Sequence, residues 1–190
     1  MDIGKTLYVT NRNDWRAWLA ANYKEEKEIW LVYYRKETGK PRIPYNDAVE
    51  EALCYGWIDS TQKKLDDERF AQRFSPRKKN SELSQANKER IIKLIAQKKM
   101  TKAGLSAIAH VFQPETEHIE EFIIPPDILQ PLKADKQAWI NFKQFPPHYQ
   151  RIRIAYIDSR RRQGQEMFEK SLKHFIKMTA MNKQIGIVQI

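Results

Sequence analysis

The chain has 190 residues, with 34 Lys and Arg against 24 Asp and Glu, a formal net charge of +10, and a single cysteine. This length suits one domain or one domain with a small appendage, and one cysteine excludes an intramolecular disulfide and a cysteine-based metal site. A basic leader followed by an apolar run is absent, as is any apolar stretch near ~20 residues, so we expect a cytoplasmic protein without membrane insertion.

Three elements are expected before residue 57. Apolar residues recur at helical spacing in NRNDWRAWLAANY, residues 11–23, which predicts a helix capped by Asn13. The following EIWLVYYRK is dense in β-branched and aromatic residues and predicts a strand buried on both faces. The segment YNDAVEEALCYG, residues 45–56, predicts a second helix that begins at an Asn46 cap and ends near its glycine.

A β-hairpin is expected next. Residues 57–65 and 69–77 form two alternating runs around the acidic turn Asp66-Asp67-Glu68. Together with residues 28–35 they predict a small antiparallel three-stranded sheet. Two amphipathic helices follow in the sequence, one capped near Ser84 and one capped by Thr101.

The charge of the chain is uneven and indicates its domain organisation. Residues 1–112 carry +7, residues 113–132 carry −5 and contain four prolines, and residues 133–190 carry +8. We therefore predict an α+β module, an acidic proline-containing linker and an all-helical C-terminal subdomain with these bounds. The helices of the last part are expected at about 127–133, 135–144, 147–160 and 165–179.

The stretch CYGWIDS, residues 54–60, contains the residue types of a nucleophilic site. Cys54 falls near the C-terminal end of its expected helix, where the helix dipole opposes a thiolate, so we interpret it as a core residue. Nucleophile elbows, phosphate loops and dinucleotide fingerprints are absent, and the four histidines show no metal-ligand spacing. An enzyme that uses Asp59 or Cys54 is therefore the less favoured interpretation, and no cofactor is expected.

The second hairpin strand places three arginines on one face and two phenylalanines on the other. The arginine face is either an anion cradle of guanidinium groups or a solvated surface paired with Asp59 and other acids, and the second is the commoner situation. The candidate anion-binding residues are Trp57, Asp59, Arg69, Arg73, Arg77 and Lys78.

Hairpin register decides which residues join these arginines. A two-residue turn would place Ile58 on the arginine face, and Trp57 and Asp59 beside the phenylalanines. A three-residue turn reverses this arrangement, and we favour it because Asp59 can then pair with Arg73 while Ile58 faces the phenylalanines. Trp57 would then be exposed beside Arg77, as a ligand-stacking surface or part of a partner interface.

The C-terminal module carries QRIRIAYIDSRRR, residues 150–162. Tyr149, Ile152 and Tyr156 trace a stripe that we expect to face mostly the core, and the arginines at 160–162 complement the dipole at the helix end. The basic charge suits nucleic acid, but a motif that reads nucleic acid is not visible.

Residues 29–105 resemble the bacterial YdeI/OmpD-associated proteins, a family labelled bacteriocin-protection. The resemblance rests on EALCYGWIDS, RFSPRKKNSELSQANKERI and MTKAGL, and it continues into the tail that starts with IPPDILQPLKADKQAW, to about Ile176. The segment AYIDSRRRQGQEMFEKSL departs from the Thr-Arg pair that is usual there. The resemblance implies protection against antimicrobial peptides and association with envelope stress, without an established reaction or cofactor.

Two hypotheses follow. The first is a non-enzymatic stress or bacteriocin-protection protein that binds an anionic small molecule or a protein partner at the arginine face. The alternative is a basic nucleic-acid-binding module, whose affinity would fall steeply with salt.

Overall fold

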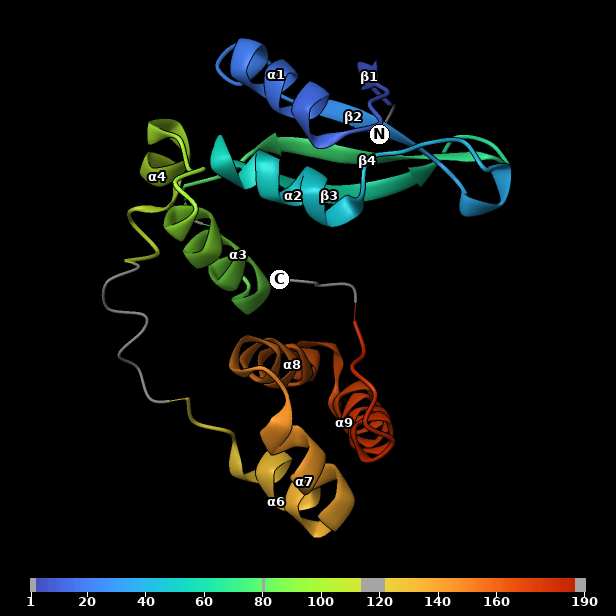
Figure 1. Ribbon diagram of the computed structural model, residues 1–190, viewed down its shortest axis with the longest axis vertical. Coiled ribbons are helices and arrows are strands. Elements are labelled where there is room, and N and C mark those ends of the chain that lie inside the picture. Colours follow the sequence, from blue (N-terminus) through green and yellow to red (C-terminus); the bar gives the residue numbers. More distant parts are fainter. Residues whose placement is uncertain (1–2, 80, 114–121, 187–190) are drawn as a thin grey trace. The chain divides into compact units, whose positions relative to one another are not determined.

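The computed structural model describes residues 3–79, 81–113 and 122–186 (Figure 1). The chain divides into two compact units. Unit 1 comprises residues 1–82 and 90–113, and unit 2 comprises residues 83–89 and 114–190. The helix α3 (Gln85–Ala96) contains the division between residues 89 and 90, so the units are not bounded at residue 112 as the predicted modules are. The predicted module bounds stay a prediction.

Unit 1 contains a four-stranded sheet with the order β1-β2-β4-β3. The strands are β1 (Thr6–Leu7), β2 (Ile29–Tyr34), β3 (Trp57–Lys64) and β4 (Arg69–Pro76). The predicted hairpin and the antiparallel β2-β4-β3 sheet are confirmed, whereas the predicted total of three strands is wrong because β1 adds a parallel edge strand beside β2. A two-residue strand is too short to show an alternating pattern in the sequence.

The helices before residue 113 confirm the predicted elements, with corrections at two caps. They are α1 (Arg12–Asn22), α2 (Tyr45–Cys54), α3 (Gln85–Ala96) and α4 (Lys102–Ile108), with a short 3-10 turn η1 at Lys36–Thr38. The first cap is Asn11 rather than Asn13, because the Asn11 side chain accepts from the Asp14 N–H at 3.0 Å. Asn46 is not a cap either, since it lies inside α2 and accepts from Arg90.

The Ser84 and Thr101 caps are confirmed. The Ser84 hydroxyl accepts from the Asn87 N–H at 3.3 Å, and the Thr101 hydroxyl accepts from the Gly104 N–H at 3.2 Å. Side-chain oxygens in these positions satisfy backbone donors that have no partner within the helix.

An aromatic layer lies between α1 and one face of the sheet, and a hydrogen bond ties α2 to it. Trp15 lies edge-on to Phe74 at 5.4 Å between ring centres, and its indole N–H donates to the Ala48 carbonyl at 2.9 Å. Trp18 meets Trp57 at 5.9 Å. These rings bury large apolar areas and fix this sheet face as the core side of unit 1.

Unit 2 forms the four helices that were predicted. They are α6 (Pro126–Ala134), α7 (Lys136–Gln144), α8 (Pro147–Ser159) and α9 (Gln165–Ala180), with a 3-10 turn η2 at Arg160–Gln163. The core of this unit includes Ile128 and Leu132 of α6, packed with Phe142 and Phe175. Most of α6 thus falls in the predicted linker, and the helix ends two residues beyond it. Residues 114–121 of that linker are outside the described residues, and the linker bounds stay a prediction.

Candidate anion-binding site

A β-bulge in β3 decides which side chains reach the arginine face. The pairs next to the turn are Lys64–Phe70, Lys63–Ala71 and Gln62–Gln72, which confirms the three-residue turn. Between Gln62 and Asp59 the register shifts, and beyond the shift the pairs are Asp59–Phe74, Ile58–Ser75 and Trp57–Pro76. Because strand side chains alternate between faces, a one-residue shift moves these three residues to the opposite face from the one predicted.

The predicted exposure of Trp57 is therefore wrong. Its side chain is on the core side and only 1% of the residue is exposed, with the indole N–H donating to the Tyr23 carbonyl at 3.2 Å. Ile58 consequently lies on the arginine face rather than beside the phenylalanines. A buried indole cannot stack on a ligand, so Trp57 contributes to the core.

The predicted Asp59–Arg73 pair is also wrong. Asp59 accepts a hydrogen bond of 2.6 Å from the Tyr45 hydroxyl at the start of α2. Burial, together with this bond to Asp59, raises the pKa of Tyr45 above its ordinary value, so the phenol stays a donor.

The arginines of β4 are tied to separate partners. Arg69 bonds to Asp66 in the turn at 2.7 Å, whereas Arg77 donates to the carbonyls of Ser81 and Glu82 at 2.6 and 3.1 Å. Eight residues of strand place Arg69 and Arg77 about 26 Å apart along the backbone. The structure therefore does not bring them together in one cradle, and the exposed Lys78 lies beyond the strand end.

Arg73 occupies the middle of the face opposite the aromatic layer. Its Nε donates to Glu28 Oε2 at 2.8 Å, and its Nη2 lies 2.7 Å from the same oxygen. The hydrogen bond from Arg73 holds the pKa of Glu28 below its ordinary range. One edge of the guanidinium is thus fixed by a carboxylate that sequence reasoning did not identify, because Glu28 is 45 residues away.

The other edge of Arg73 is held weakly. Nη1 donates to the hydroxyls of Ser60 and Ser75 at 3.3 and 3.4 Å, long for charge-assisted bonds. Lys63 lies nearby, with its Nζ 5.7 Å from the ring centre of Trp30, the residue that pairs with Arg73 across β2 and β4. Guanidinium and hydroxyl donors converge here beside a second cation, which is the donor set that an oxyanion uses.

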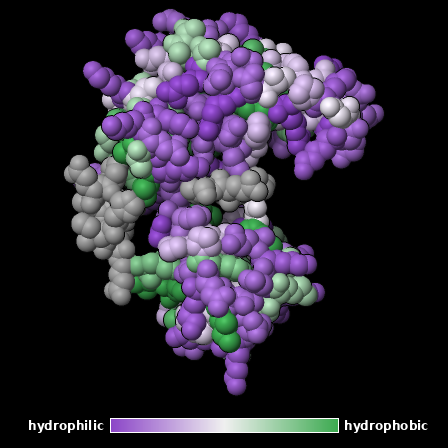
Figure 2. Space-filling model, viewed as in Figure 1, coloured by the Kyte–Doolittle hydropathy of each residue, from purple (hydrophilic) through white to green (hydrophobic). Residues whose placement is uncertain are grey.

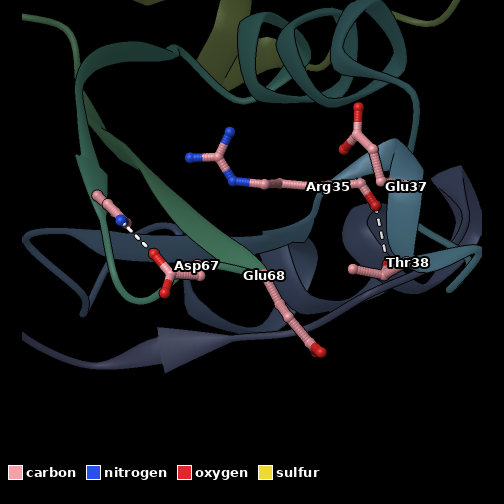
Figure 3. Close-up of a pocket in the computed structure, with 6 residues that line it drawn as sticks. Arg35, Glu37, Thr38, Asp67 and Glu68 are labelled. Carbon is pink, nitrogen blue, oxygen red and sulfur yellow. Dashed lines mark hydrogen bonds and ion pairs between the residues drawn. The ribbon is translucent and has the colours of Figure 1, made fainter.

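A shallow hollow of about 490 Å³ lies at the turn end of the sheet (Figure 3). It is lined by Arg35, Glu37, Thr38, Lys64, Asp67 and Glu68. In Figure 3 the Arg35 side chain extends toward the strand end that carries Asp67, while Glu68 points away. Three carboxylates against two cations disfavour an anion here, so the Arg73 environment is the better candidate.

The described ranges contain no group of three His, Cys, Asp or Glu placed to hold a metal ion. Within the same ranges, no helix is both long enough and apolar enough to cross a membrane. Hydrophilic residues cover most of the face drawn in Figure 2.

Cys54 is a core residue, as the sequence indicated. It is fully buried, and burial raises the pKa of its thiol to about 11. Its carbonyl accepts from the backbone N–H and the hydroxyl of Thr101 at 3.1 and 2.6 Å, which docks the start of α4 on the end of α2.

We expect iodoacetamide to label native Cys54 slowly, because the thiol is buried and protonated near neutral pH. Labelling in denaturant should be on the order of 100-fold faster. Mass spectrometry over a time course gives both rates, and comparable rates in the two conditions would contradict the buried thiol.

Two family models match the chain. The model of a domain of unknown function, DUF8412, matches residues 7–107, and the model described as bacteriocin-protection, YdeI or OmpD-associated, matches residues 121–182. The second match confirms the resemblance within residues 121–182, and the first, a different family model, covers the segment that carries the signature motifs. Comparison with curated proteins and with solved structures found no match.

Proposed function

The chain belongs to the family of the domain of unknown function DUF8412 and carries a YdeI or OmpD-associated bacteriocin-protection segment, and from this premise we propose that it is a non-enzymatic protection protein that binds an anionic small ligand at Arg73. The ligand is an oxyanion, a phosphate or a carboxylate. The site comprises Arg73, Ser60, Ser75 and Lys63.

A single observation carries this proposal: Arg73 is fixed on one edge and weakly held on the other. Glu28 positions the guanidinium, so binding costs little side-chain entropy. The two long bonds from Nη1 are replaced by a shorter bond to an oxyanion, and the serine hydroxyls then turn to donate to the same ligand. Only 22% of the Arg73 side chain is exposed, which strengthens its charge interaction relative to a fully solvated arginine.

The bulge supports the same proposal, because it positions Ser60. The Ser60 carbonyl accepts from the Gln72 side chain at 2.9 Å, which holds the irregular backbone in place. β-Bulges are enriched where a side chain is re-aimed at a functional site.

Isothermal titration of the full chain with inorganic phosphate, and separately with acetate, tests the site. We expect Arg73→Gln to weaken binding at this site by more than about tenfold, because it removes the guanidinium whose N–H groups donate to the ligand oxygens. Arg69→Gln is the matched control, since Arg69 lies on the same strand and face but is paired with Asp66. The affinity of the Arg69→Gln chain for the ligand should stay within about twofold of that of the unaltered chain.

A second variant keeps the proposal testable if Arg73→Gln fails to fold. The double variant Ser60→Ala and Ser75→Ala leaves the Arg73–Glu28 pair intact and should weaken binding by about five- to tenfold. Equal losses in the Arg73 and Arg69 variants would overturn the proposal. Binding of an oligonucleotide that collapses with salt, without binding of phosphate or acetate, would instead favour the nucleic-acid alternative.

A further inference from the structure

A second cationic feature lies in unit 2, on α8. Tyr149, Arg153, Tyr156 and Arg160 are spaced four, three and four residues apart, which places them on one face of the helix. We refer to these four residues as the Arg/Tyr stripe. The sequence predicts that the tyrosines of this stripe face mostly the core, but Tyr156 is 43% exposed.

Arg153 is a buried cation that pairs with no acidic side chain among the described residues. Only 9% of the residue is exposed, and its Nε has no hydrogen-bond partner. Within the described residues the guanidinium has no ion pair with a carboxylate, and its neighbour is the Tyr156 ring, 4.6 Å from Cζ to the ring centre. Burial lowers the pKa of Arg153, which indicates that the cation is poorly solvated.

Arg160 adds a second cation to the same ring. Its Cζ lies 5.6 Å from the centre of the Tyr156 ring, and its Nε is also buried without a partner. Because both distances end at one ring centre, the two guanidinium carbons are within about 10 Å of each other. Two like charges this close favour an anion beside them.

The neighbouring Arg161, by contrast, has its guanidinium paired with carboxylates. It makes a two-pronged contact with Asp127, at 2.8 and 2.9 Å, and a bond of 2.8 Å to Asp158. These nearby carboxylates are therefore already engaged by Arg161 rather than by Arg153 or Arg160.

The backbone at residues 185 and 186 builds a wall beside Arg153. The Ile185 N–H donates to the Tyr149 hydroxyl at 2.9 Å, and that hydroxyl keeps its own proton to donate. Gly186 has φ of +106°, and a Cβ there would lie 2.7 Å from Arg153 Nη1. The positive φ favours glycine at this position, and the backbone here passes close to the guanidinium.

We propose that the Arg/Tyr stripe is a second anion-binding site, which takes a phosphate group next to Arg153 and Arg160. Phosphate suits the stripe because guanidinium groups bind it through paired N–H donors, and because a dianion compensates two cations. The site is independent of Arg73, which lies in unit 1.

Counting phosphate sites by isothermal titration tests this proposal. The unaltered chain should bind two phosphates, the Arg73→Gln chain one, and a chain with Arg73→Gln, Arg153→Met and Arg160→Gln none. Starting from the Arg73→Gln chain, Arg161→Gln is the matched control and should leave the remaining site within about twofold.

Thermal melting without phosphate separates a binding role from a structural one. Arg153→Met removes an unpaired buried charge while keeping an unbranched side chain, so the melting temperature should stay unchanged or rise. Retention of the second phosphate in the Arg153 and Arg160 variants would overturn the proposal. A marked fall in the melting temperature of Arg153→Met would overturn it too, because the charge would then be satisfied within the fold.

Discussion

Replacement of Glu51 by alanine is expected to lower the free energy of unfolding by about 3 kcal/mol. Glu51 lies on α2 with 1% of the residue exposed. One of its oxygens lies 2.9 Å from Arg12 Nε, and the other accepts from Arg16 Nη1 at 2.6 Å. Removal of this buried carboxylate takes away the carboxylate paired with Arg16 and leaves Arg12 with Glu50 and Asp47. The loss falls at the lower end of the usual range because both arginines are partly exposed and can recruit water.

The matched control is Glu68→Ala, which removes a carboxylate that is 61% exposed and pairs with Lys40 at 3.2 Å. Because solvent screens this exposed pair, Glu68→Ala should change the free energy of unfolding by no more than about 0.5 kcal/mol. Urea unfolding, followed by tryptophan fluorescence, measures both changes. Similar losses for Glu51→Ala and Glu68→Ala would contradict the buried network.

The same network extends to Glu50, the neighbouring buried acid of α2. Arg12 also bonds to Glu50, and Lys93 of α3 lies 3.4 Å from it. Cations from α1 and α3, two segments far apart in the sequence, thus converge on one turn of α2. We infer that this is why two adjacent acids are tolerated inside unit 1.

Gly104→Ala is expected to destabilise the chain by about 3 kcal/mol. A Cβ at this position would lie 2.3 Å from the Cys54 carbonyl oxygen, a backbone atom that cannot turn aside. Helix propensity alone would give the opposite sign, since alanine in an open helix is favoured over glycine by about 0.5–1 kcal/mol. The sign of the change in the free energy of unfolding, measured with urea, therefore tests whether α4 approaches α2 this closely.

Ser106→Ala is the control for Gly104→Ala, because Ser106 is exposed on the same helix. Its effect should be within about 0.5 kcal/mol. A stabilised Gly104→Ala chain would show that the space for the methyl group exists, and the close packing of these helices would be wrong.

This contact also explains the signature motifs in physical terms. EALCYGWIDS and MTKAGL lie about 45 residues apart in the sequence, yet a glycine of each motif packs against the backbone of the other. Gly104 lies on the Cys54 carbonyl, and a Cβ at Gly56 would lie 3.3 Å from the carbonyl oxygen of Ala103 within MTKAGL and 2.6 Å from the Cβ of Ala107 just after it. The motifs therefore describe the packing of α2 on α4, to which Cys54 belongs, whereas Asp59 and Ser60 of CYGWIDS lie on β3.

Local signals in the sequence determined most of the secondary structure. Ser84 and Thr101 were identifiable as caps because a short oxygen-bearing side chain before an amphipathic run has few other roles. The burial of β2 followed from its unbroken apolar run, and the four helices of unit 2 followed from their periodicity and prolines. The hairpin followed from the acidic residues between two alternating segments, whereas its three-residue turn was favoured for an Asp59–Arg73 pair that the bulge prevents.

Only the tertiary structure decided which residues meet at the candidate site. The extra residue in β3 between Asp59 and Gln62 has no local signal, yet it reverses the faces of Trp57 and Asp59 because strand side chains alternate with a period of two. The partner of Arg73 was equally unpredictable from the sequence, because Glu28 adjoins Arg73 only through the pairing of β4 with β2 in the sheet. Caps and periodicity act over a few residues, whereas register and partner choice depend on contacts between segments that are distant in the chain.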